Sequence, residues 1–92
     1  MILLNAVTAN TTGTAQRFAT PMISVWVEGT LAGDVVTLEV ARVGNSGDNT
    51  GVYVPIASVT TKGVTNIYIP GVFYLRAVLS SASGATITVA TN

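Results

Sequence analysis

Apolar and polar residues alternate along most of this chain with a period of two, which is the pattern of β-strands with one buried face. The strand formers Val, Ile and Thr dominate, whereas the helix formers Lys and Gln occur once each. Eight segments fit the strand pattern: 1–4, 16–19, 22–28, 35–42, 52–58, 64–69, 73–80 and 85–91. No window combines the helical period with helix caps. The pattern therefore predicts an all-β protein.

Short segments rich in Gly, Asn, Ser and Asp separate these strands, as turns do. They cover residues 32–34, 44–51, 61–63, 70–71 and 80–84. Strands that recur every 8 to 12 residues or so, each followed by a turn, are typical of an antiparallel sandwich or a small barrel. We expect one such domain, of jelly-roll or immunoglobulin-like type, over residues 1–92, because 92 residues are too few for two cores.

The first 20 residues differ from the rest of the chain. Residues 6–14 are polar and have no clear period. They form either a surface loop after a short edge strand or an extended arm that adds to the sheet edge of a neighbouring chain. We therefore expect an N-terminal strand and this loop or arm in residues 1–20, and the sandwich core in residues 21–92.

Trp26 is the most informative single residue of the chain. The predicted strand 22–28 has a uniformly apolar face made of Ile23, Val25 and Val27. Its other face, which carries Met22, Ser24, Trp26 and Glu28, therefore points outward. A Trp there has to be covered, either by another chain or by residues 6–14 of the same chain. Because Trp is enriched at binding hot spots, we predict that Trp26 is an interface residue.

The charge content restricts the partners of the protein. Charged residues make up 9% of the chain, against about 25% in ordinary soluble domains, while 49% of the residues are hydrophobic. Four basic and four acidic residues cancel, so no net field attracts nucleic acid or a membrane surface. No apolar run approaches the roughly 18 residues of a membrane-spanning helix. A small core and a nearly uncharged surface together predict a homo-oligomer.

The inventory of reactive side chains excludes most catalysis. The chain has no Cys and no His, which removes disulfides, thiolate nucleophiles, Ser-His-Asp triads and the usual zinc ligands. Glu28 and Asp34 flank a tight turn, and Glu39 lies on an outward strand face, so no pair of carboxylates suggests a catalytic site. Asp48 stands alone in its loop, which is too little charge to bind calcium tightly. We predict no enzymatic activity, no metal and no cofactor.

Two stretches of the chain have a more specific pattern. Residues 25–40, VWVEGTLAGDVVTLEV, form a strand, a Gly-bounded hairpin and a second strand. In residues 73–89, FYLRAVLSSASGATITV, an Arg-Ala-Val strand turns through a Ser/Ala/Gly loop into a Thr-rich strand. Both patterns resemble those of small β-sandwich virion proteins of tailed bacteriophages, and together they cover a little over a third of the chain. Those proteins often have an Asp-Gly turn followed by a Trp, where this chain has the longer loop 47–51 and then Tyr53.

The resemblance implies a structural role in a virion. Such proteins serve as capsid decoration or cement proteins, as head-fibre bases or as tail-fibre modules. We expect a decoration protein that binds junctions between major capsid protein subunits and stabilises the head, with a trimer favoured. Residues 1–5 lack the features of a signal peptide, so we expect synthesis in the cytoplasm of the host bacterium and a final place on the capsid surface of the virion.

Two alternatives to a decoration protein remain open. One is a head-fibre or tail-fibre module. The other is a small carbohydrate-binding β-sandwich, whose aromatic residues would stack on sugar rings: Trp26, Tyr53, Tyr68 and Tyr74. For the decoration protein, the expected interface residues are Trp26, Met22, Tyr53, Tyr74 and Arg76.

Overall fold

The computed structural model describes residues 1–91 and has no helix in that part of the chain. The strands are β1 (Ile2–Val7), β2 (Thr11–Thr12), β3 (Gln16–Phe18), β4 (Met22–Glu28), β5 (Val35–Val43), β6 (Asn49–Val59), β7 (Gly63–Tyr68), β8 (Phe73–Ser80) and β9 (Ile87–Thr91). The prediction of an all-β chain is confirmed. Each of the eight predicted segments corresponds to a strand, and β4 and β8 have the predicted bounds.

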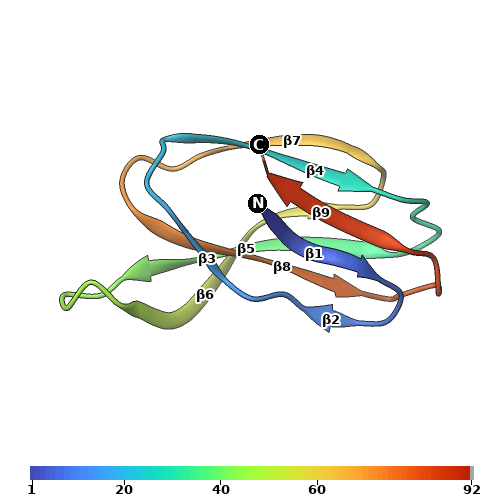
Figure 1. Cartoon of the computed structure of the whole chain (residues 1–92), viewed down its shortest axis with the longest axis horizontal. Helices are drawn as coiled ribbons and strands as arrows, with labels where there is room; N and C mark the ends of the chain where they lie inside the picture. The colour runs from blue at the N-terminus through green and yellow to red at the C-terminus, as the bar shows by residue number, and fades with distance from the viewer. Residues whose placement is uncertain (92) are drawn as a thin grey trace.

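The strands form two antiparallel sheets that pack against each other (Figure 1). Sheet I has the strand order β1-β9-β4-β7. Sheet II has the order β2-β8-β5-β6, and the short strand β3 pairs with β8 beside β2. Over residues 1–91 the two sheets stay separate, so of the two predicted forms the structure has the sandwich.

The core lies between the sheets because alternate residues of each strand point inward. Buried positions on β4 are Ile23, Val25 and Val27, and those on β8 are Phe73, Leu75, Ala77 and Leu79. Side chains of β5 and β9 complete the centre: Val36, Leu38, Ile87 and Val89. Full burial of one such aliphatic side chain contributes about 1.5 to 3 kcal/mol, and this contribution drives the two sheets together.

The N-terminal segment belongs to the sandwich. Leu3 and Leu4 of β1 are buried in the core, and β1 pairs with β9. The chain then crosses to sheet II, where Thr11 and Thr12 pair with β8 and the Gly13 amide donates to the Ala77 carbonyl oxygen at 2.8 Å. Residues 6–14 thus connect the two sheets of their own chain and do not extend away from it. The core also includes residues that precede the expected boundary at position 21.

The hairpin between β5 and β6 projects from one end of the sandwich (Figure 1). The molecule measures 40 by 21 by 18 Å along its principal axes. The expected connection 44–51 is shorter than predicted, because β6 already begins at Asn49. The Gly44 amide closes the turn by donating to the Asp48 carbonyl oxygen at 2.7 Å. The side-chain amide of Asn49 donates to the Tyr53 hydroxyl at 2.7 Å, which ties the turn to the strand.

Asp34 is a buried carboxylate that joins two loops of the sandwich. Its Oδ1 accepts a hydrogen bond from the Ala32 amide and its Oδ2 accepts one from the Ser83 amide, both at 3.0 Å. The Ser83 hydroxyl and amide, helped by the Ala32 amide, hold the pKa of this carboxyl below its ordinary value, although burial acts in the opposite direction. The hydrogen bonds assign Asp34 a structural role.

We expect Asp34 to make the fold sensitive to acid. Because the folded-state pKa lies below the ordinary value of 3.8, ionised Asp34 stabilises the fold at pH values above about 4. This contribution is lost as the pH falls through the folded-state pKa. Urea unfolding between pH 7 and pH 2 should therefore show a flatter acid limb for Asp34→Asn than for the wild type. Ser83→Ala, which removes only the hydroxyl donor, should change the limb in the same direction but less. Identical acid limbs for Asp34→Asn and wild type would contradict this assignment.

Candidate interaction surfaces

The outward face of sheet I carries a row of apolar side chains that crosses all four strands. The strand register places Ile2 of β1 opposite Ala90 of β9, Ala90 opposite Trp26 of β4, and Trp26 opposite Val64 of β7. Opposite residues of neighbouring strands have Cβ atoms roughly 4.5 to 5.5 Å apart. Ile2, Trp26 and Val64 are all exposed. We call these four residues the apolar row.

A second apolar pair lies on the same face, nearer the start of β4. Met22 of β4 is opposite Tyr68 of β7, and both side chains are exposed. Between this pair and the apolar row, Ser24 is opposite Asn66, and the Ser24 hydroxyl donates to Asn66 Oδ1 at 2.9 Å. The face therefore has two apolar strips separated by one hydrogen-bonded polar pair.

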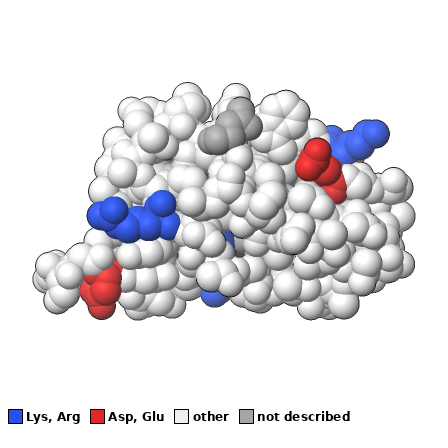
Figure 2. Space-filling model, viewed as in Figure 1, with Lys and Arg blue, Asp and Glu red and all other residues white. Residues whose placement is uncertain are grey.

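This face has almost no charge. Glu28 is the only charged side chain in the four strands of sheet I as the structure describes them. In the view of Figure 2, most of the visible charged side chains lie towards the two ends of the molecule, and a wide area between them is largely uncharged. Transfer of charged groups out of water costs free energy when an interface forms. Because this face has few charges, its burial against a partner avoids most of that cost.

Trp26 lies on the side of its strand that the alternation predicts. Its side chain is 43% exposed, while the neighbouring inward residues Val25 and Val27 are buried. Residues 6–14, the alternative cover, run to β8 in sheet II and leave Trp26 open. The part of the chain that the structure describes therefore leaves room for a partner on Trp26.

Tyr53, Tyr74 and Arg76 lie together on the outward face of sheet II. Tyr53 of β6 and Tyr74 of β8 are both opposite Ala41 of β5, which is buried between them. The guanidinium carbon of Arg76 lies 3.5 Å from the centroid of the Tyr53 ring, and its Nε donates to Glu39 Oε1 at 2.7 Å. The charge of Arg76 is thus already balanced within the chain, by a carboxylate and by an aromatic face.

The five predicted interface residues consequently do not form one site. Met22 and Trp26 share the outward face of sheet I, and the other three share the outward face of sheet II, on the opposite side of the sandwich. Tyr53, Tyr74 and Arg76 are each half-buried, and side-chain interactions within the chain hold Tyr53 and Arg76. The surface around Trp26 is the more exposed of the two, and no contact of the Trp26 or Met22 side chain within the described chain corresponds to the Arg76 interactions.

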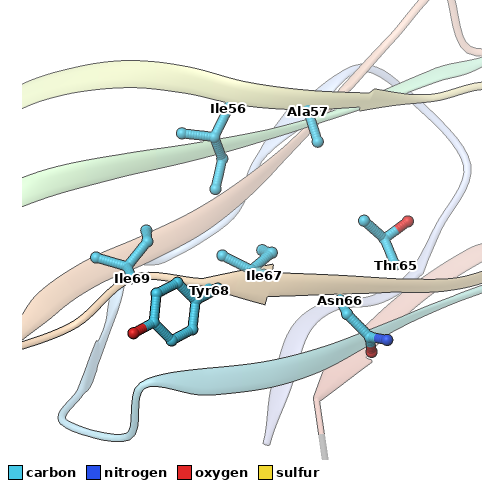
Figure 3. A pocket seen from close by; sticks show the side chains of 7 residues that line it. All are labelled: Ile56, Ala57, Thr65, Asn66, Ile67, Tyr68 and Ile69. Atoms are coloured by element: carbon cyan, nitrogen blue, oxygen red, sulfur yellow. The ribbon is translucent and has the colours of Figure 1, made fainter.

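A groove of about 220 Å³ lies between β6 and β7, each of which is an edge strand of its sheet (Figure 3). In Figure 3, Ile56 and Ala57 point from β6 towards β7, and Ile67 and Ile69 point towards β6. Sequence reasoning missed this groove, since it depends on which strands become edges. The available signal was the absence of charged residues from 49–59 and 63–68.

The acidic side chains do not gather into a metal-binding cluster in the part of the chain that the structure describes. Within residues 1–91, no three side chains of the types that bind metals come close enough to share an ion. Asp34 is used in loop hydrogen bonds and Glu39 in the ion pair with Arg76. In the same range, no helix is long and apolar enough to cross a membrane.

No protein-family model, curated protein or solved structure matches this chain. The features that bear on function are therefore the two outward faces and the groove.

Proposed function

We propose that this protein is a non-enzymatic structural protein of a phage virion, and more specifically a capsid decoration protein. It binds at junctions between major capsid protein subunits and stabilises the head, after synthesis in the cytoplasm of the host bacterium. The observation that carries the proposal is the exposed apolar row around Trp26 on a sheet face that has one charged side chain. The resemblance of residues 25–40 and 73–89 supports the assignment to phage.

A decoration protein acts by burying surface and makes no covalent change. The apolar row follows a sheet surface, which is a suitable shape for contact with an extended shell. Burial of apolar surface contributes about 25 cal/mol for each Å² removed from water. A Trp at the centre of such a contact is often a hot spot, whose truncation costs about 2 kcal/mol or more.

Self-association is part of the proposal. A 92-residue chain without disulfides buries a modest core, and a net charge of zero does not keep copies apart. The resemblance favours a trimer, whereas the composition favours an oligomer without setting the number of copies. Each additional copy on a shell would present a further apolar row to the capsid.

The test of the proposed function is Trp26→Ala. We expect this variant to keep the β-type circular dichroism spectrum and to lose at least about 30-fold in affinity for capsids that lack their decoration protein, which corresponds to about 2 kcal/mol. Co-sedimentation with purified capsids measures the binding. Val52→Ala is a matched control, since Val52 is 69% exposed on β6, away from the Trp26 face.

Two results would count against this assignment. Capsid binding by Trp26→Ala with wild-type affinity would remove Trp26 from the interface. Unfolding of the isolated subunit on this substitution, without any oligomer in the wild type, would show that Trp26 serves the fold itself. The copy number in purified virions separates a decoration protein, present in large numbers, from a head-fibre or tail-fibre module present in a few copies.

One arrangement favours carbohydrate binding as a second function. Trp26 and Tyr68 stand on the same outward face, on neighbouring strands and four register positions apart, which is about 14 Å along the strand direction. Two aromatic side chains with the polar pair Ser24 and Asn66 between them have the chemistry to stack on and hydrogen-bond an oligosaccharide. Trp26 is the only Trp, so titration with oligosaccharides should change the intrinsic fluorescence if this function is correct.

A further inference from the structure

Three of the four sheet edges carry features that oppose pairing with another chain. The pairing of β1 with β9 has two register shifts, β2 and β3 are two and three residues long, and β6 contains Pro55 and two register shifts. Short, bulged and Pro-containing edges are common ways to prevent strand addition. The fourth edge, β7, pairs with β4 over six consecutive residues without a shift and has no Pro and no charged residue.

We propose that β7 is the edge through which two copies of this chain associate. The two β7 strands pair antiparallel about a two-fold axis at Asn66 and join two four-stranded sheets into one sheet of eight strands. The inference rests on the self-association in the proposed function but not on its capsid partner. It names a two-fold contact, which differs from the trimer that the resemblance favours.

The register of this pairing follows from the directions of the side chains. Val64, Asn66 and Tyr68 lie on the outward face of β7, and in a continuous sheet outward residues must be opposite outward residues. Centring the pair on Asn66 places Val64 opposite the partner's Tyr68. Val64 is 49% and Tyr68 is 66% exposed, so this register covers the two most exposed apolar side chains of β7 twice. A shift of two residues would place Asn66 opposite an apolar side chain.

A stable pair needs contact area beyond β7 itself, and the neighbouring strand β6 lies beside this edge. Such a pair buries roughly 800 Å² on each partner, which is about one sixth of the 4902 Å² surface of this chain. Because β6 and β7 border the same groove, β6 lies close to the proposed two-fold axis and adds contact through its side chains, without strand pairing. Val54 and Ile56 of β6 are exposed, and β6 has no charged residue to oppose the contact.

The pairing also enlarges the surface around Trp26. Val64 ends the apolar row at the free edge of sheet I. In the pair, the partner's Tyr68 lies beside Val64, and the partner's Met22 lies one strand further on. The row therefore continues across the two-fold axis into the second copy, so that two Trp26 side chains face the same way on one sheet.

A charge swap at Asn66 tests the pairing. Asn66→Asp and Asn66→Lys each place like charges opposite each other on the two-fold axis, and like charges directly opposite destabilise a strand pair. Sedimentation equilibrium should show a wild-type dimer of two 9.4 kDa chains. Each variant alone should dimerise at least 10-fold more weakly than the wild type. An equimolar mixture of the two should restore the dimer, because Asp then faces Lys.

Asn5→Asp is the matched control. Asn5 is exposed on β1, the opposite edge of sheet I, so this variant should dimerise like the wild type. A wild-type monomer or trimer, or an Asn66→Asp variant that dimerises normally, would overturn the inference. Capsid binding by a monomeric Asn66→Asp variant would leave the proposed function in place, and a wild-type dimer without capsid binding would contradict only that function.

Discussion

Leu75→Ala should lower the free energy of unfolding by about 2 to 5 kcal/mol, the range for buried Leu-to-Ala changes. Leu75 is the third residue of β8 and is fully buried, with β5 on one side of its strand and β3 on the other. Removing its side chain leaves a cavity between the two sheets that the surrounding strands cannot fully close. Since small domains are stable by about 5 to 15 kcal/mol, this loss is a large share of the total.

Urea unfolding monitored by circular dichroism measures the effect of Leu75→Ala. The protein concentration has to be the same for all variants, because self-association adds a concentration-dependent contribution to the apparent stability. Val52→Ala removes an exposed apolar side chain and should change the free energy of unfolding by less than about 0.5 kcal/mol. A loss below about 1 kcal/mol for Leu75→Ala would show that the sheets do not pack around this residue.

Gly29→Ala should destabilise the protein by about 2 to 6 kcal/mol, for two separate reasons. Gly29 has a φ of 118°, a conformation that residues with a side chain adopt only with strain of about 1 to 3 kcal/mol. A Cβ at this position would also overlap the carbonyl oxygen of Thr86 and press on Ile87, which adds about 1 to 3 kcal/mol. The backbone oxygen has no alternative rotamer, so the clash is relieved only by moving the chain.

Gly33→Ala separates the two contributions to the Gly29 effect. Gly33 also has a positive φ, of 87°, but a Cβ there would meet no atom within 4 Å. Its replacement should therefore show the backbone strain alone, and the difference between the two variants in urea unfolding reports the overlap with Thr86. Equal losses for the two variants would contradict a close approach of β4 to the loop before β9.

The alternation of apolar and polar residues predicted a strand well where one face of the strand is buried in the core and the other is exposed to solvent. On β4 the inward residues Ile23, Val25 and Val27 are buried, and Trp26 between them is exposed. The alternation therefore placed Trp26 on the outward face without any knowledge of the partner strands. It failed at Thr11 and Thr12, because a two-residue strand has no period and forms only where the chain passes β8.

The end of β1 shows a second limit of the pattern. This strand continues to Val7, three residues beyond its predicted end, by way of two register shifts and a left-handed residue, Ala6, with φ of 51°. An Ala in that conformation is unfavourable taken alone. The Ala6 amide donates to the Thr88 hydroxyl oxygen at 3.2 Å, a contact with a strand far along the chain. Local propensities carry no information about such a contact.

The candidate interface residues could also be predicted only in part from the sequence. Sequence reasoning selected Trp26, Met22, Tyr53, Tyr74 and Arg76, and the structure places them on two opposite faces. Each residue was assigned to a strand correctly, but the sheet that each strand joins was unknown. Tyr68, which is opposite Met22, was a candidate only for sugar stacking until its pairing with β4 placed it beside the Trp26 face.

The sequence by itself determined that the chain is all-β, where most strands lie and which residues of β4 and β8 point inward. Side chains alternate within a strand whatever its partners are, so this information is local. Only the tertiary structure decided which strands pair, and therefore which edges stay free, where the groove lies and which aromatic residues share a face. These pairings join distant segments, as in the hydrogen bond from the Thr91 amide to the Met1 carbonyl oxygen. Their free energy comes from burial between whole sheets, which no short stretch of sequence records.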